Sequence, residues 1–138
     1  MTQPIVLITF YSHCGSTEKL ALSAAVGAVQ ARGSIRLRRV PDVSSFNDCA
    51  ETLTRMRKEY VAPQEADILG ANALVVAMPS AFSPTSPEWV QYYALIERLR
   101  IEGKLQGKLE VVIDSGISIE SATVLGRNTV DRVRALAP

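Results

Sequence analysis

The fold is decided by residues 5–20, which read IVLITFYSHCGSTEKL. The first six of them, Ile5 to Phe10, form an apolar run rich in β-branched side chains. Such a run is typical of a strand buried on both faces, and therefore of a parallel sheet with helices on each side. Small and hydroxyl-bearing residues follow, and then an alanine-rich segment that predicts a helix over residues 18–31, with Gly33 as its C-terminal stop.

The junction from Ser12 to Thr17 is a candidate phosphate-binding loop. A strand that turns directly into a helix presents unpaired backbone N–H groups and the positive end of the helix dipole at one point, where a phosphate binds well. The hydroxyls of Ser12, Ser16 and Thr17 could add donors. The same residues also fit an ordinary turn at Gly15 followed by a capped helix. The segment matches neither the Walker pattern nor the G-x-G-x-x-G dinucleotide pattern.

Length and composition limit the class of protein. The 138 residues predict a single domain over 1–138. A net charge of +1 argues against a nucleic-acid surface, which carries a basic excess. The chain shows neither a signal-peptide pattern nor a membrane span, and Cys14 and Cys49, in a loop and an expected helix, give no disulfide framework. A cytoplasmic location is therefore expected.

The rest of the chain alternates strands with helices. Strands are expected over 5–10, 34–40, 73–78 and 109–113, and helices over 18–31, 45–60, 65–69, 87–102 and 120–136. This alternation predicts an α/β fold with a doubly wound parallel sheet in the order 2-1-3-4, in which the loops after strands one, three and four meet at the carboxyl edge. The alternating strand 34–40 suits a sheet edge, and its arginines at 36, 38 and 39 predict a charged, solvated edge, with an anion site as the alternative.

Two details of the helices are expected from local patterns. Ser45 and Asp48 resemble a capping box that opens the second helix. In the last helix, Gly126 is expected to weaken the helix midway. The apolar side of that helix is expected to carry Val124, Val130, Val133 and Leu136.

Four short motifs, in this order, carry a resemblance. Ser12–Thr17 matches S-x-x-G-x-[TI], and Pro79–Pro84 stands where the pattern P-T-R-F-G-N is found. Gly103–Lys108 matches G-x-L-x-G-K, and Asp114–Gly116 corresponds to S-T-G. The chain resembles the flavodoxin-like flavoproteins, and most closely the NAD(P)H:quinone oxidoreductases once named tryptophan-repressor-binding proteins.

The resemblance implies an FMN-binding oxidoreductase that passes electrons from NAD(P)H to a quinone or similar acceptor, with no side chain acting as acid or base. It places the FMN phosphate on Ser12, His13, Cys14, Gly15, Ser16 and Thr17, and it borders the flavin ring with Pro79, Ser80, Ala81, Phe82, Ser83, Ser115 and Gly116. From the net charge and the residues themselves, no nucleic-acid partner and no metal are expected.

The sequence also departs from this family. Ala81, Ser83 and Pro84 replace the arginine, glycine and asparagine of the ring loop. After Gly116 the chain passes directly to its closing helix, so a fifth strand is expected to be missing. Residues 111–113 would then form an exposed apolar edge, which predicts a homodimer or a larger assembly.

Two other functions remain open. A shortened flavodoxin-like protein that has lost flavin and acts as a binding or assembly protein fits the same departures. A thiol enzyme that uses Cys14 is the third interpretation, since a helix N-terminus stabilises a thiolate. A resolving C-x-x-C partner for Cys14 is missing from the sequence, and His13 with Cys14 gives only two metal ligands.

Overall fold

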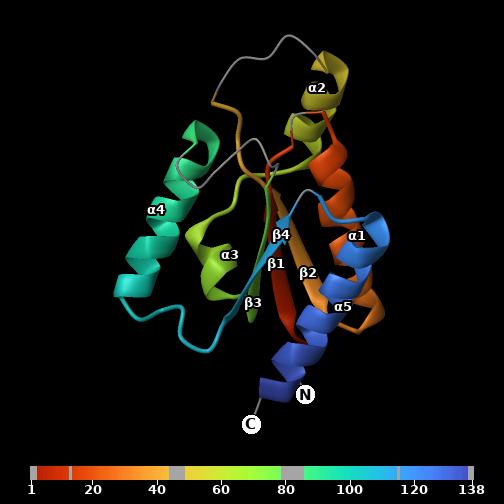
Figure 1. Ribbon diagram of the computed structural model, residues 1–138. Helices are drawn as coiled ribbons and strands as arrows, with labels where there is room; N and C mark the ends of the chain where they lie inside the picture. The colour runs from red at the N-terminus through yellow and green to blue at the C-terminus, as the bar shows by residue number, and fades with distance from the viewer. Residues whose placement is uncertain (1–2, 13, 44–48, 79–85, 115, 137–138) are drawn as a thin grey trace.

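The computed structural model describes residues 3–12, 14–43, 49–78, 86–114 and 116–136 of the chain (Figure 1). Strands and helices alternate along it, as the sequence predicts. In chain order the elements are β1 (Ile5–Phe10), α1 (Ser16–Gln30), β2 (Ser34–Arg39), α2 (Ala50–Glu59), α3 (Glu65–Leu69), β3 (Ala73–Met78), α4 (Pro87–Ile101), β4 (Leu109–Asp114) and α5 (Ile119–Leu136).

The four strands form one parallel sheet in the order β2-β1-β3-β4, which confirms the predicted topology. Phe10, near the end of β1, is in register with Arg39 of β2 and Ala77 of β3, and Ala77 is in register with Ile113 of β4. All four strands therefore end at the same edge of the sheet. This is the edge at which parallel α/β folds bind ligands.

Helices cover both faces of the sheet (Figure 1). On one face, Val6, Ile8 and Phe10 of β1 pack with α1, α2 and α5. On the other, Leu7 of β1 packs with α3 and with the buried Trp89 of α4. The central strand is thus buried from both sides, which is why its apolar run does not alternate. Within the described part of the chain, no helix is long and apolar enough to cross a membrane.

Helices α1 and α5 approach each other more closely than the sequence suggests. A Cβ atom at Gly126 would lie 1.9 Å from the carbonyl oxygen of Ala24, and one at Gly27 would lie 1.9 Å from that of Thr123. Gly126 therefore lies where the two helices cross, and α5 runs through it from Ile119 to Leu136. The expected apolar side is partly wrong for the same reason: Val124 and Leu136 are exposed, and the buried residues of α5 are Ala122, Gly126, Thr129 and Val130.

The start of α2 differs from the prediction. Its N-cap is Cys49, whose φ of 58° lies in the left-handed region, so no helix continues through this residue from position 45. Ser45 and Asp48, the expected capping box, lie outside the described residues. The helix begins at Ala50, which moves Cys49 from a helix interior to a helix end.

Candidate active site

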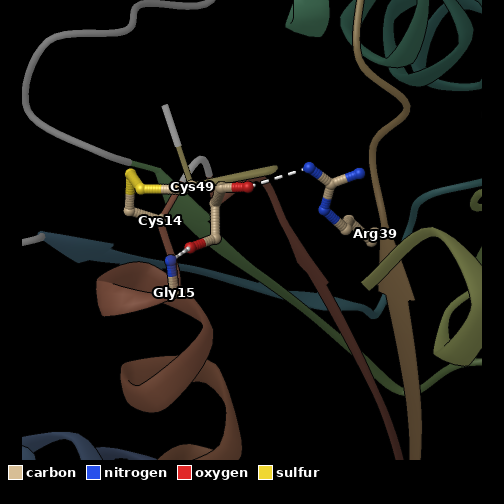
Figure 2. The surroundings of a disulfide bond; sticks show 5 residues. Cys14, Gly15, Arg39 and Cys49 are labelled. Carbon is tan, nitrogen blue, oxygen red and sulfur yellow. Dashed lines mark hydrogen bonds between the residues drawn. A yellow bond between two sulfur atoms is a disulfide. The ribbon is translucent and has the colours of Figure 1, made fainter. Parts of the chain in front are cut away.

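The loop after β1 is shaped by hydrogen bonds of Ser12. This residue is buried, and its Oγ accepts a hydrogen bond from the backbone N–H of Gly15 at 2.9 Å. Its carbonyl oxygen accepts a second one from Nη2 of Arg39 at 2.8 Å (Figure 2). Ser12 is therefore held from the loop itself and from the end of the neighbouring strand β2.

Gly15 places the first turn of α1 at the end of this loop. Its φ of 101° is a conformation that glycine adopts readily and other residues rarely adopt. Gly15 is the N-cap of α1, and no side chain caps the helix within the described residues. The N–H groups of Ser16, Thr17 and Glu18 lie in the first turn, before the first helical hydrogen bond, which Lys19 donates to Gly15. This is the arrangement that binds anions at helix N-termini.

The two cysteines form a disulfide bond beside this loop. Cys14 and Cys49 are joined with their Cα atoms 5.4 Å apart (Figure 2). The expectation of two separate cysteines, and the argument from it for a reducing compartment, is therefore wrong. The pairing follows from the topology: β1 and β2 are neighbours, so the segments that follow them lie at the same edge. The sequence pattern assigned Cys49 to the interior of a helix, and for this reason the pairing with Cys14 was not predicted.

Arg39 is a site residue that the sequence reasoning misassigned. Its side chain is 3% exposed and pairs with Asp42 at 2.9 Å, and its guanidinium lies over the ring of Tyr11 at 5.1 Å from the ring centroid. The prediction of a solvated arginine edge is thus wrong at this position. Asp42 also accepts hydrogen bonds from Arg57 at 2.9 Å and from the Tyr11 hydroxyl at 2.8 Å. The strand end and the loop after it are locked together by this network.

The electrostatics of Asp42 follow from these partners. Burial alone would raise the pKa of its carboxyl group, but hydrogen bonds from Arg39, Arg57 and Tyr11 outweigh burial and lower the pKa from 3.8 to about 2. Asp42 is therefore charged at every physiological pH. Its negative charge balances Arg39, which leaves the loop without a strong positive field from this arginine.

Glu18 is a buried carboxylate in the first turn of α1. It accepts hydrogen bonds from Arg55 at 2.6 and 2.9 Å and from the Tyr60 hydroxyl at 2.6 Å. The hydrogen bonds from Arg55 are the largest influence and lower the pKa of Glu18 against the effect of burial. The guanidinium of Arg55 compensates the negative charge near the anion-binding turn. The same contacts attach α2 to α1.

The predicted site residues are placed to different degrees. Ser12, Cys14, Gly15, Ser16 and Thr17 lie together in the loop and the first turn of α1. Gly116 follows β4, and its N–H donates to Oδ1 of Asp114 at 3.0 Å. The other predicted residues lie outside the described part of the chain: His13, Pro79, Ser80, Ala81, Phe82, Ser83 and Ser115.

A flavodoxin-like fold with an uncapped helix N-terminus at its switch point is the class that these features define. Among solved structures, the chain is similar to the WrbA-like flavodoxin of Agrobacterium tumefaciens, with a TM-score of 0.65, 13% identity, and coverage of 98% of this chain and 100% of that one. It is also similar to the flavodoxin of Streptococcus pneumoniae TIGR4, with a TM-score of 0.55, 14% identity, and coverage of 96% and 99%. These likenesses confirm the fold.

Curated relatives are similar at low identity. The chain is 27% identical over 110 residues to "NAD(P)H dehydrogenase (quinone) 3" of Rhizobium meliloti, which is 80% of this chain and 52% of that protein. It is 25% identical over 115 residues to "NAD(P)H dehydrogenase (quinone)" of Archaeoglobus fulgidus, covering 80% of this chain and 60% of that protein. The chain thus spans little more than half the length of these relatives. No protein-family model matches it.

Proposed function

We propose that this chain is a single-domain, FMN-binding oxidoreductase that passes electrons from NAD(P)H to a quinone or a similar acceptor. One observation carries the proposal: the first turn of α1, which begins after the N-cap Gly15 and is uncapped by any described side chain, follows a central strand of a flavodoxin-like sheet. The names of the curated relatives support the same activity.

The phosphate end of FMN fits the residues that are present. The backbone N–H groups of Ser16, Thr17 and Glu18 would donate to the phosphate oxygens, and the hydroxyls of Ser16 and Thr17 would be side-chain donors from the same turn. Arg55 keeps the Glu18 carboxylate paired, so that its charge repels the phosphate less. When bound, the isoalloxazine ring supplies the redox chemistry. The chain's own residues bind and orient, and none is assigned a proton transfer.

In this proposal Arg39 holds the loop in position without contacting the phosphate. By donating to the Ser12 carbonyl, it fixes the start of the loop, and through Ser12 Oγ it influences the position of Gly15. Arg39 is therefore a positioning residue. The predicted ring-bordering residues Pro79, Ser80, Ala81, Phe82, Ser83 and Ser115, and the predicted phosphate contact His13, stay part of the proposal.

The test is a titration of the purified protein with FMN and, in parallel, with riboflavin, which lacks the phosphate. We expect saturable quenching of flavin fluorescence at low micromolar FMN and at least tenfold weaker binding of riboflavin, about 1.4 kcal/mol. Gly15→Asp should abolish FMN binding, because it adds a negative charge and a side chain at a positive φ.

Gly107→Asp is the matched control for this substitution. Gly107 also has a positive φ, 80°, but a Cβ there meets no atom within 4 Å, and it lies in the turn between α4 and β4. Gly107→Asp therefore places a non-glycine residue at a positive φ and adds one negative charge, as Gly15→Asp does, but far from the loop. FMN binding should persist in this variant. If the wild-type protein binds no FMN up to about 1 mM, weaker than about 4 kcal/mol, the oxidoreductase proposal is wrong.

A flavin-free binding or assembly protein is the second candidate, and for such a protein the β4 edge would be the interaction surface. Val112 of β4 is 67% exposed, and β4 has a neighbour on one side only among the described strands. We propose under either function that a second copy of the chain covers this edge. The flavin titration separates the two functions, since only the first requires FMN.

A cytoplasmic location remains part of the proposal. In a reducing compartment the Cys14–Cys49 bond would be exposed to a pool of thiols. Alkylation of the free thiols in intact cells, followed by fractionation, tests the location and reports the state of the bond in the same experiment.

A further inference from the structure

The disulfide bond joins the N-terminal ends of two helices. Cys14 immediately precedes Gly15, the N-cap of the 15-residue helix α1, and Cys49 is itself the N-cap of the 10-residue helix α2. Neither helix has a side-chain cap among the described residues. A thiolate at such a position is stabilised by the unpaired N–H groups and by the helix dipole. Opening the bond would therefore place both thiolates in favourable surroundings.

The two cysteines differ in their exposure to solvent. Cys14 is exposed, whereas Cys49 is only partly exposed. The buried carboxylate in the first turn of α1, that of Glu18, is paired with Arg55 and Tyr60. An incoming thiolate thus reaches the sulfur of Cys14 more easily than that of Cys49, and Cys49 is well placed to leave as a thiolate.

We propose that Cys14 and Cys49 form a thiol–disulfide exchange site that takes low-molecular-weight thiols. In the first step, a thiolate forms a bond to Sγ of Cys14, the Cys14–Cys49 bond breaks, and its electron pair leaves on Sγ of Cys49. In the second step, another thiolate attacks the sulfur of the bound small thiol and releases Cys14. The protein disulfide gains two electrons, the two small thiols become one disulfide, and the protons they carried pass to the protein thiols or to solvent.

The reduced form is expected to remain folded, because α2 is held by more than the disulfide. Arg55 and Tyr60 bond Glu18 of α1, and the ring of Tyr60 packs edge-on against Phe10 of β1 at a centroid distance of 4.9 Å. Leu53 and Met56 of α2 are buried in the core. These contacts keep Cys49 close to Cys14 after reduction, so the bond can form again and the cycle can repeat.

The proposal is independent of FMN, and its test uses none. The full-length protein is equilibrated without denaturant in buffers of reduced and oxidised glutathione, and its thiols are alkylated and counted by intact mass. We expect complete and reversible conversion between the disulfide and the dithiol across the glutathione series, with an unchanged circular dichroism spectrum. If the bond resists excess reduced glutathione in the native protein and opens only in urea, or if it never forms, the proposal is wrong.

Two single-cysteine variants test which cysteine carries the mixed disulfide. Cys49→Ser leaves the exposed Cys14, and Cys14→Ser leaves the partly buried Cys49, so each variant is the control of the other. With oxidised glutathione, Cys49→Ser should form the mixed disulfide at least tenfold faster than Cys14→Ser. Equal rates in the two variants would contradict the assignment of Cys14 as the residue that carries the mixed disulfide. The wild-type titration requires no variant, so it decides the proposal even if one variant fails to fold.

A charge substitution tests the part played by the helix N-terminus. Glu51 lies in the first turn of α2, where its negative charge opposes the Cys49 thiolate. Glu51→Gln should shift the glutathione equilibrium toward the dithiol by about two- to fivefold at low ionic strength. Glu97→Gln on α4, across the sheet, should leave it unchanged (Figure 1). An equal shift in both variants, or none in either, contradicts stabilisation by the helix end.

Discussion

Asp42 is a residue whose charge contributes to stability and is lost at acid pH. Its pKa is about 2 in the folded protein, below the ordinary value of 3.8. Its stabilising contribution is therefore complete above about pH 4 and is lost as the pH falls toward 2, because the unfolded chain takes up the proton first. With the side chain 7% exposed, the shift corresponds to about 2 kcal/mol. Urea denaturation at pH 7, 4, 3 and 2 should show this loss.

Tyr11→Phe isolates one partner of Asp42 without changing the shape of the side chain. The variant removes the hydrogen bond from the hydroxyl to Oδ1 of Asp42 and should lower the free energy of unfolding at pH 7 by about 1 kcal/mol. It should also reduce the loss between pH 4 and 2, since the native pKa of Asp42 rises. Tyr93→Phe, whose hydroxyl has no hydrogen bond among the described residues, is the control. Identical acid profiles in both variants would contradict the role of Tyr11.

The disulfide contributes to stability as well as to chemistry. Joining residues 35 apart stabilises a fold by about 4 kcal/mol in the chain-entropy model. Stabilisation of the two thiolates by the helix ends favours the folded dithiol. We therefore expect reduction to lower the free energy of unfolding by less than the chain-entropy value, by about 2–3 kcal/mol. Chemical denaturation of the oxidised and the reduced protein at pH 8 measures the difference. A cost at or above the chain-entropy value would mean that the helix ends do not stabilise the thiolates.

The residues of the loop could be predicted only in part. The order of strand, hydroxyl-rich loop and alanine-rich helix was sufficient to place Ser12, Gly15 and Thr17 together, because these features are local. Arg39 could not be assigned in this way. Its burial depends on Asp42 and on the Ser12 carbonyl 27 positions earlier, and an alternating strand pattern carries no information about either partner.

At the level of secondary-structure elements, the crossing of α1 and α5 is the contact most sensitive to substitution. Gly126→Ala would place a Cβ atom 1.9 Å from the backbone oxygen of Ala24, so one of the two helices must move. Despite the better helix propensity of alanine, we expect the free energy of unfolding to fall by about 2–3 kcal/mol. Thermal and urea denaturation measure this effect.

Gly70→Ala is the control for the helix crossing. Gly70 ends α3 with an ordinary negative φ, and the closest atom to an added Cβ is Nη1 of the flexible Arg36 side chain at 2.9 Å. The arginine can move aside, so stability should change by less than about 0.5 kcal/mol. If Gly126→Ala is tolerated as well as Gly70→Ala, the close approach of α1 and α5 is not part of the folded protein.

Helices were predicted well where a long sequence pattern defines them. They were predicted poorly where contacts with other elements determine which residues are buried or where the helix begins. The buried positions of α4 include Trp89, Tyr92, Ile96 and Leu99, and they follow the helical spacing that a sequence pattern carries. In α5, the side that faces α1 is lined by small residues, which an apolar-stripe argument overlooks. The start of α2 was missed because a left-handed Cys49 is stabilised by its bond to Cys14, a contact that no local pattern contains.

For the whole molecule, the two edges of the sheet differ in a way that predicts assembly. The β2 edge carries Arg36 and Arg38, and charged side chains of this kind discourage further pairing. The β4 edge carries Val112, which is 67% exposed. Ile113 is buried, so the expectation that all of residues 111–113 would be exposed is wrong at this position. Val111 lies between two hollows beside β4: one of about 90 Å³ against α4 and one of about 370 Å³ against α5. A strand added at this edge would lie alongside both hollows.

Val112→Lys tests whether a second copy of the chain pairs at β4. A lysine on an exposed strand edge opposes edge-to-edge pairing, so the variant should sediment as a monomer at micromolar concentrations at which the wild-type protein is a dimer or larger. Val29→Lys makes the same change at a position of α1 with 55% exposure, and it should assemble like the wild-type protein.

Because β4 ends at the edge where Gly116 is predicted to border the flavin, the dimer would also bring a second chain close to the candidate site. FMN affinity measured across the dissociation range of the wild-type protein would show whether the site needs that second chain, and a monomeric wild-type protein would leave the β4 edge uncovered and contradict the proposed assembly.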